Sequence, residues 1–338
     1  MRPENVTFNF RILIFLISLA LFLNNSARSQ EQIPANRMDY HLSWDGKSTI
    51  LKIDLVYNSN GDSTIFIFGN TAIGGQPRIF EILGNPKVGS DDSLHILPKS
   101  RKLIVRHNTQ GIKKLHYEID GKLITDTVKV RVNEAFRPTI APGFLYSLGF
   151  QLFMNVSDTS FSQMGIVWDS WPKGIPYLVS TDPEAHPDEM QIIKYEDRYT
   201  FMLQMSESLR IHKNVVKGIP YYLLTSKSDS TSGLPDKIKV MMTKFTPQVR
   251  DFWQDYSGPF YILSAIPFQN KVSSKITGMG LRDGLSIRYS GPLDFEKTQV
   301  IAHEISHYWI GVRLKYASKE WKTIGLMKDL TIILRFIL

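Results

Sequence analysis

The sequence predicts an α+β fold, in which a β-sandwich-like N-terminal domain precedes a domain that mixes helices and strands. Two observations support this prediction. Residues 37–203 contain short runs rich in β-branched and aromatic side chains, separated by turn sequences at regular spacing. From residue 206 onward, helical periodicity alternates with strand-like runs and a glycine-rich segment. We divide the chain into residues 1–29, a signal peptide; residues 30–205, the β-rich domain; and residues 206–338, the mixed domain.

The β-rich domain is predicted from alternation and turn chemistry. Residues 49–57 alternate apolar and polar side chains and are followed by the turn sequence Asn-Ser-Asn-Gly-Asp. An Asp-Gly pair at residues 120–121 predicts a hairpin turn. The other predicted strands of this domain lie at residues 64–68, 103–105, 115–119, 127–132 and 165–168. Short strands at this spacing are typical of a β-sandwich.

The second domain is predicted to begin near Ser206. A helix is expected from Leu234 to Tyr256, with a kink or break at Pro247. Strands at residues 260–266 and 285–289 flank a glycine-rich element, and a helix follows from about residue 300 to Gly311.

The most informative motif lies in that last helix. Residues 303–307 read His-Glu-Ile-Ser-His, an H-E-x-x-H pattern. Residues four apart share one face of a helix, so His303 and His307 can bind one metal ion together. Glu304 can take a proton from a metal-bound water. The alternative is an ordinary amphipathic helix with two solvated or internally bonded histidines, but two imidazoles and a carboxylate in an apolar segment need a partner. The motif therefore predicts a zinc site.

A family resemblance follows from the wider segment. Residues 302–311 read Ala-His-Glu-Ile-Ser-His-Tyr-Trp-Ile-Gly and resemble the A-H-E-x-x-H-x-W-F-G segment of the aminopeptidase N-type gluzincins, which are zinc metallopeptidases. Trp309 and Gly311 fall where that pattern has them, and Ile310 replaces the usual Phe. The resemblance implies a β-rich domain followed by a thermolysin-like catalytic domain, and it implies hydrolysis of peptide or protein substrates.

The resemblance also implies roles for individual residues. His303 and His307 would be Zn²⁺ ligands, and Glu304 would be the catalytic general base. The glycine-rich element would contact the substrate through its backbone, at the positions Gly278, Met279, Gly280 and Asp283. The Glu that binds the substrate's amino group in the family is absent here. Asp283 is a candidate replacement, although Asp-Gly pairs more commonly mark hairpin turns, so strict aminopeptidase specificity does not follow.

The family's third zinc ligand is a Glu within a W-L-N-E-G-F-like segment, and residues 323–338 contain no Glu. One permitted set of codons for residues 324–330 spells Trp-Leu-Asn-Glu-Gly-Phe in an alternative reading frame. We therefore hypothesise a frameshift near Lys322 or Thr323, which would leave a C-terminally truncated and inactive chain. Glu320 and Asp329 are the carboxylates that could substitute as ligands. Alternatively, the apolar residues 332–338 form a genuine C-terminal helix or membrane-seeking tail.

Charge and the N-terminus indicate the compartment. The net charge is +8 without a concentrated basic patch, so nucleic-acid binding is not expected. Arg2 and Arg11, the apolar residues 12–23 and the small residues after them indicate a signal peptide. That apolar run is shorter than the ~20 residues of a stable membrane span, which leaves an uncleaved signal anchor as the alternative. With 0 Cys, an exported bacterial-type protein, secreted or periplasmic, is expected.

The predicted function is that of an aminopeptidase-like zinc metallopeptidase, which hydrolyses peptide bonds with a zinc-activated water and Glu304 as the general base. Two other classes remain open. A non-catalytic exported β-domain protein could bind a partner and retain the zinc helix as a relic. A membrane-anchored structural protein would rest only on the two apolar ends of the chain.

Overall fold

The computed structural model describes residues 33–71, 78–121, 136–157, 160–227, 240, 243–244, 246–267, 276–290, 300–301 and 304–305. All of them from Ala35 onward belong to one compact unit. The predicted signal peptide and the strand predicted at 127–132 lie outside the described residues. Within the described part of the chain, no helix has the length and apolar character that a membrane crossing requires.

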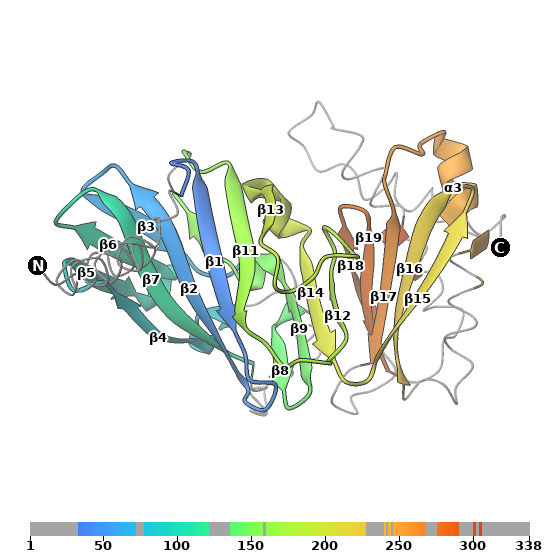
Figure 1. Cartoon of the computed structure of the whole chain (residues 1–338), viewed down its shortest axis with the longest axis horizontal. Coiled ribbons are helices and arrows are strands. Elements are labelled where there is room, and N and C mark those ends of the chain that lie inside the picture. Colours follow the sequence, from blue (N-terminus) through green and yellow to red (C-terminus); the bar gives the residue numbers. More distant parts are fainter. Residues whose placement is uncertain are drawn as a thin grey trace, which may run out of the picture. The chain divides into compact units, whose positions relative to one another are not determined.

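Two sheets build the first half of the compact unit (Figure 1). Strand β1 lies at the centre of the larger one, antiparallel to β2 and parallel to β11. The six strands of that sheet, in spatial order, are β13 (Gln191–Lys194), β11 (Gln163–Ser170), β1 (Arg37–Ser43), β2 (Ile50–Ser59), β7 (Gly111–Asp120) and β4 (Leu83–Val88). The second sheet runs in the order β10 (Asn155–Val156), β3 (Ser63–Ile67), β6 (Lys102–His107) and β5 (Asp92–Leu97).

The alternation predicted for the first strands produces the core of these sheets. Leu51, Ile53 and Leu55 of β2 are fully buried, whereas Lys52 and Asp54 between them are exposed. The buried side chains join those of β1, β3, β6 and β7 in one apolar cluster. The 3₁₀ helices η1 (Ile79–Ile82), η2 (Pro98–Ser100), η4 (Gly149–Gln151) and η5 (Tyr195–Tyr199) connect the strands.

A third sheet links this half to the rest of the unit. Its order is β12 (Tyr177–Val179), β14 (Met202–Ser206), β9 (Phe144–Leu148) and β8 (Thr139–Ala141). The fourth sheet runs in the order β15 (Leu209–Val216), β16 (Ile219–Ser226), β17 (Tyr261–Pro267), β19 (Gly284–Tyr289) and β18 (Ile276–Leu281). In it, β16, β17 and β19 are parallel, and the edge strands β15 and β18 are antiparallel to their neighbours.

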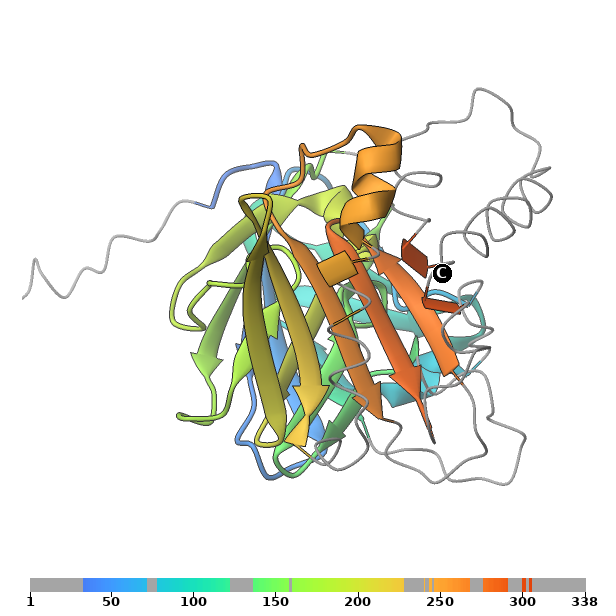
Figure 2. The same ribbon diagram turned by 90° about the vertical axis from the view of Figure 1, so that its right-hand side faces the viewer.

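The fourth sheet is covered on both faces. One face packs against helix α3 (Thr246–Trp253) and the segment around residue 300, since Val249 and Ile301 share a cluster with Leu263 of β17. Figure 2 shows α3 beside these strands. The other face packs against β9 and β14, and Tyr146 and Ser286 share a buried hydroxyl–hydroxyl hydrogen bond of 2.9 Å. Cover on both faces explains why β17 and β19 are buried along almost their whole length and mostly apolar, with Ser264, Ser286 and Arg288 as the polar exceptions.

The predicted α+β fold class is wrong. The described residues form four sheets and a single helix with described bounds, α3, so the fold is mostly β and the expected thermolysin-like helical domain is not what these residues form. The physical reason is that the runs at 209–226, 261–267 and 276–289 satisfy their backbone hydrogen bonds by pairing with one another as one sheet. The prediction gave too much weight to two helical patterns and did not recognise the β15–β16 hairpin.

The structure describes only part of the region in which a helix was predicted, from Leu234 to Tyr256. Helix α3 begins at Thr246 and ends at Trp253. Residues 240 and 243–244 are also helical, and Pro247 is buried within α3. The predicted domain boundary between residues 205 and 206 falls at the end of β14, and the division into domains stays a prediction.

Candidate active site

Glu304, the predicted general base, lies on the helical segment that faces the fourth sheet. Residues 300–301 and 304–305 are helical, and Ile301 and Ile305 are fully buried in the cluster shared with α3. Their spacing of four residues places both on one face of the helix, against the strands. Because Ile301 and Ile305 are held in the core, the position of Glu304 relative to the edge strand β18 is fixed.

The side chain of Glu304 packs directly on Gly278 of β18. A Cβ atom added at Gly278 would lie 2.4 Å from Cγ of Glu304 and 2.9 Å from its Cδ. Real Cβ contacts are essentially never that short, so only glycine permits this approach. Gly278 pairs with Ile287 and Gly280 with Leu285 across the hairpin, so both glycines point to the same face of the strand.

The electrostatic setting of Glu304 follows from the same contact. Burial raises the pKa of Glu304 to about 7, and a hydrogen bond from the backbone of Gly280 partly opposes that rise. A carboxyl group with a pKa near neutrality can both accept and return a proton at physiological pH. Perturbed carboxyl groups of this kind are enriched at catalytic sites.

The other predicted site residues fall into three groups. Gly278 and Gly280 lie beside Glu304. Met279 belongs to the alternate set of side chains on β18 and packs against the cluster on the opposite face of the sheet. Asp283 lies in the turn between β18 and β19 and lines a separate cavity. The substrate-binding role of these four residues stays a prediction.

The predicted zinc ligands His303 and His307 lie outside the described residues, as do Glu320 and Asp329. Among the residues that the structure describes, no group of three or more His, Asp or Glu side chains is arranged to hold a metal ion. The described residues therefore include the predicted base and the strand that it contacts, and the zinc ligands stay a prediction from the motif.

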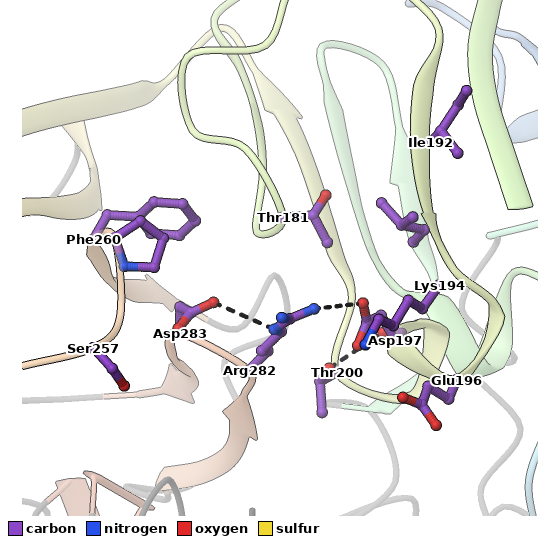
Figure 3. Close-up of a pocket in the computed structure, with 12 residues that line it drawn as sticks. Thr181, Ile192, Lys194, Glu196, Asp197, Thr200, Ser257, Phe260, Arg282 and Asp283 are labelled. Carbon is purple, nitrogen blue, oxygen red and sulfur yellow. Dashed lines mark hydrogen bonds and ion pairs between the residues drawn. The ribbon is translucent and has the colours of Figure 1, made fainter. Parts of the chain in front are cut away.

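The cavity beside Asp283 is about 770 Å³ in volume (Figure 3). Arg282 lies between two carboxylates there, 2.6 Å from Asp197 of η5 and 3.7 Å from Asp283. The complete lining is Thr181, Ile192, Ile193, Lys194, Glu196, Asp197, Thr200, Ser257, Pro259, Phe260, Arg282 and Asp283. Sequence reasoning missed the ion pair of Arg282 with Asp197 because 85 positions separate the two residues and Asp197 lies in no motif.

Comparison with known proteins gives a fold relationship. A solved structure of an aminopeptidase N family protein from Idiomarina loihiensis resembles this chain with a TM-score of 0.61 at 12% sequence identity. The match covers 80% of this chain and 47% of that one, so this chain spans about half the length of the protein it resembles. No protein-family model and no curated protein matches the sequence. At this identity, the similarity establishes a shared fold.

Proposed function

We propose that this protein is a zinc-dependent metallopeptidase that hydrolyses peptide bonds next to the edge strand β18. The observation that carries the proposal is the contact of Glu304 with Gly278. It supports the proposal because the helical segment that carries the H-E-x-x-H pattern places its Glu, partly buried and with a raised pKa, against the backbone of β18, which is an edge strand among the described residues. The fold shared with an aminopeptidase N family protein supports the same reaction class.

We propose that Zn²⁺ is held by the two motif histidines, which lie outside the described residues, and by a third ligand that the sequence does not identify. The helical segment points its apolar residues Ile301 and Ile305 into the core, and its polar residue Glu304 toward β18. The motif places His303 and His307 four residues apart on this helix, where they would hold the ion. Bound Zn²⁺ would lower the pKa of a coordinated water and polarise the carbonyl of the substrate.

The chain's own residues would do the rest. Among the described residues, β18 is an edge strand of its sheet, so an extended peptide could pair with it through main-chain hydrogen bonds. A peptide paired there would lie across the glycines, where no side chain separates its backbone from Glu304. Glu304 would accept a proton from the attacking water and return it to the leaving amine.

Zinc binding tests the metal site first. We expect the purified full-length chain to bind zinc, with affinity falling by at least about tenfold in His303→Ala and His307→Ala, as for loss of a metal ligand. His95→Ala is the matched control, because His95 lies exposed on β5. Equal zinc binding by all four proteins would refute the metal site.

Peptide hydrolysis tests the chemistry. Glu304→Gln keeps the size of the side chain and removes its basicity, so it should retain zinc and lose any turnover of a fluorogenic peptide. Turnover that survives this substitution would exclude Glu304 as the base. Zinc binding without turnover in the unsubstituted chain would support the metal site and leave export and partner binding as the function to pursue.

A further inference from the structure

Helix α3 buries two polar side chains where it packs beside the fourth sheet (Figure 2). Thr246 and Arg250 are four positions apart, so they lie one turn apart on the same side of the helix. Thr246 is fully buried, and Arg250 is 1% exposed. Cζ of Arg250 lies 6.0 Å from the centre of the Tyr261 ring, at the residue where β17 begins. The two side chains are therefore enclosed near the amino-terminal end of that strand.

Neither side chain has a hydrogen-bond partner among the residues that the structure describes. The atoms concerned are Oγ1 of Thr246 and the Nε, Nη1 and Nη2 atoms of Arg250. Asp251, the acid next to Arg250 in the sequence, pairs with Lys217 instead, at 2.6 Å. Burial raises the pKa of Tyr221, and the positive charge of Arg250 opposes that rise, which places the guanidinium near the hydroxyl of Tyr221 on β16.

A buried guanidinium needs a counter-charge. It stays protonated at any physiological pH, so it cannot become neutral as a buried lysine can. A buried ion without a partner is strongly unfavourable, and a buried hydroxyl without an acceptor adds to that cost. Side chains four apart on a helix lie about 5–6 Å apart at Cβ, so one group with two anionic oxygens can accept hydrogen bonds from both.

We propose that Thr246 and Arg250 form a binding site for an anionic oxygen group, between α3 and the amino-terminal ends of β16 and β17. The guanidinium would donate two parallel hydrogen bonds to the group, and the Thr246 hydroxyl would donate a third. The group is a protein carboxylate or a free oxyanion such as sulfate, which share this chemistry. Its binding would hold α3 against the sheet that carries the candidate active site, and it does not depend on the proposed peptidase function.

The stability of the purified full-length chain tests the site. The Tm is measured for the unsubstituted chain and for Arg250→Met, with sulfate replacing chloride at constant ionic strength. If the group is a free oxyanion, sulfate should raise the Tm of the unsubstituted chain by about 2 °C or more for each tenfold rise in concentration. The Tm of Arg250→Met should not respond to sulfate.

A protein carboxylate gives a different result in the same experiment. Arg250→Met should then have a Tm at least about 5 °C lower without sulfate, because it leaves a buried carboxylate unpaired. That difference should narrow as the pH falls below ~4, where the carboxylate takes up a proton. A Tm of Arg250→Met that equals or exceeds that of the unsubstituted chain in every buffer would overturn the proposal. A difference that changes with neither sulfate nor pH would also overturn it.

Two further variants separate anion binding from a general loss of packing. Thr246→Val keeps the shape of the side chain and removes one donor, so it should lower the Tm or weaken the response to sulfate. A higher Tm in Thr246→Val would show that the hydroxyl has no acceptor and would count against the site; this variant also carries the test if Arg250→Met does not fold. Arg210→Met is the matched control, because Arg210 is exposed on β15, and it should change the Tm by no more than about 1 °C.

Discussion

The contact between Gly278 and Glu304 predicts a specific cost for one added methyl group. In Gly278→Ala, the new Cβ would lie 2.4 Å from Cγ and 2.9 Å from Cδ of Glu304, so the carboxylate side chain must move. Inserting a methyl group into a packed site costs about 1–3 kcal/mol. Replacing glycine by alanine in a permitted backbone conformation returns about 0.4–1 kcal/mol through the unfolded state. We therefore expect a net loss of about 1–2 kcal/mol in the free energy of unfolding.

A double-mutant cycle isolates that contact. Urea unfolding followed by tryptophan fluorescence gives the free energy for the unsubstituted chain, Gly278→Ala, Glu304→Ala and the double variant. If the clash with Glu304 is the cause, Gly278→Ala should be neutral or slightly stabilising in the Glu304→Ala background, with a coupling energy of about 1 kcal/mol or more.

The control is Gly89→Ala, because a Cβ at Gly89 would meet no atom within 4 Å. That variant should change the free energy of unfolding by no more than about 0.5 kcal/mol. An equal loss from Gly278→Ala in both backgrounds would show that Glu304 does not lie on Gly278, and the candidate site would lose its central observation.

Three further results are expected. Gly284→Ala should destabilise the chain by about 3 kcal/mol or more, measured by urea unfolding, because its Cβ would lie 2.1 Å from the backbone oxygen of Ile262, which cannot rotate away. Burial raises the pKa of Asp92, but hydrogen bonds, including one from Lys113, outweigh it, so the pKa is lowered overall. The ionised Asp92 therefore stabilises the folded state above pH ~4, and this stabilisation is lost as the pH falls. Asp92→Asn should therefore cost about 3 kcal/mol at pH 7 and progressively less below pH ~4; a gap that is constant with pH would contradict this. If zinc is bound, a chelator should lower the Tm of the unsubstituted chain and leave that of His303→Ala unchanged.

The sequence was informative where a local pattern determines local structure. Alternation in residues 49–57 correctly predicted a strand, since residues 50–57 lie in β2 (Ile50–Ser59). The H-E-x-x-H pattern and the glycine-rich element were each visible in the sequence, and the structure brings Glu304 and Gly278 into contact. Each of these features depends on side chains only a few positions apart, which is the range over which periodicity and turn chemistry act.

Features that depend on distant pairing could not be predicted in this way. Strand β15 is largely exposed, so its sequence lacks the apolar run that marks a buried strand, and it was missed. The ion pair of Arg282 with Asp197 and the cavity around it arise only when β18 and η5 come together in the fold. The α+β prediction failed for the same reason, because helical patterns are local and the pairing that joins β16 to β17 is not.

The central position of β1 has a consequence for how the chain is made. Its partner β2 follows it closely, but its parallel partner β11 begins only at Gln163. At about 5–20 residues per second, a ribosome needs several seconds or more to add the intervening chain. During that interval, one edge of β1 presents unpaired N–H and C=O groups that other chains can join. Efficient production of this protein should therefore depend on a holding chaperone that covers the edge of β1 until β11 has been synthesised.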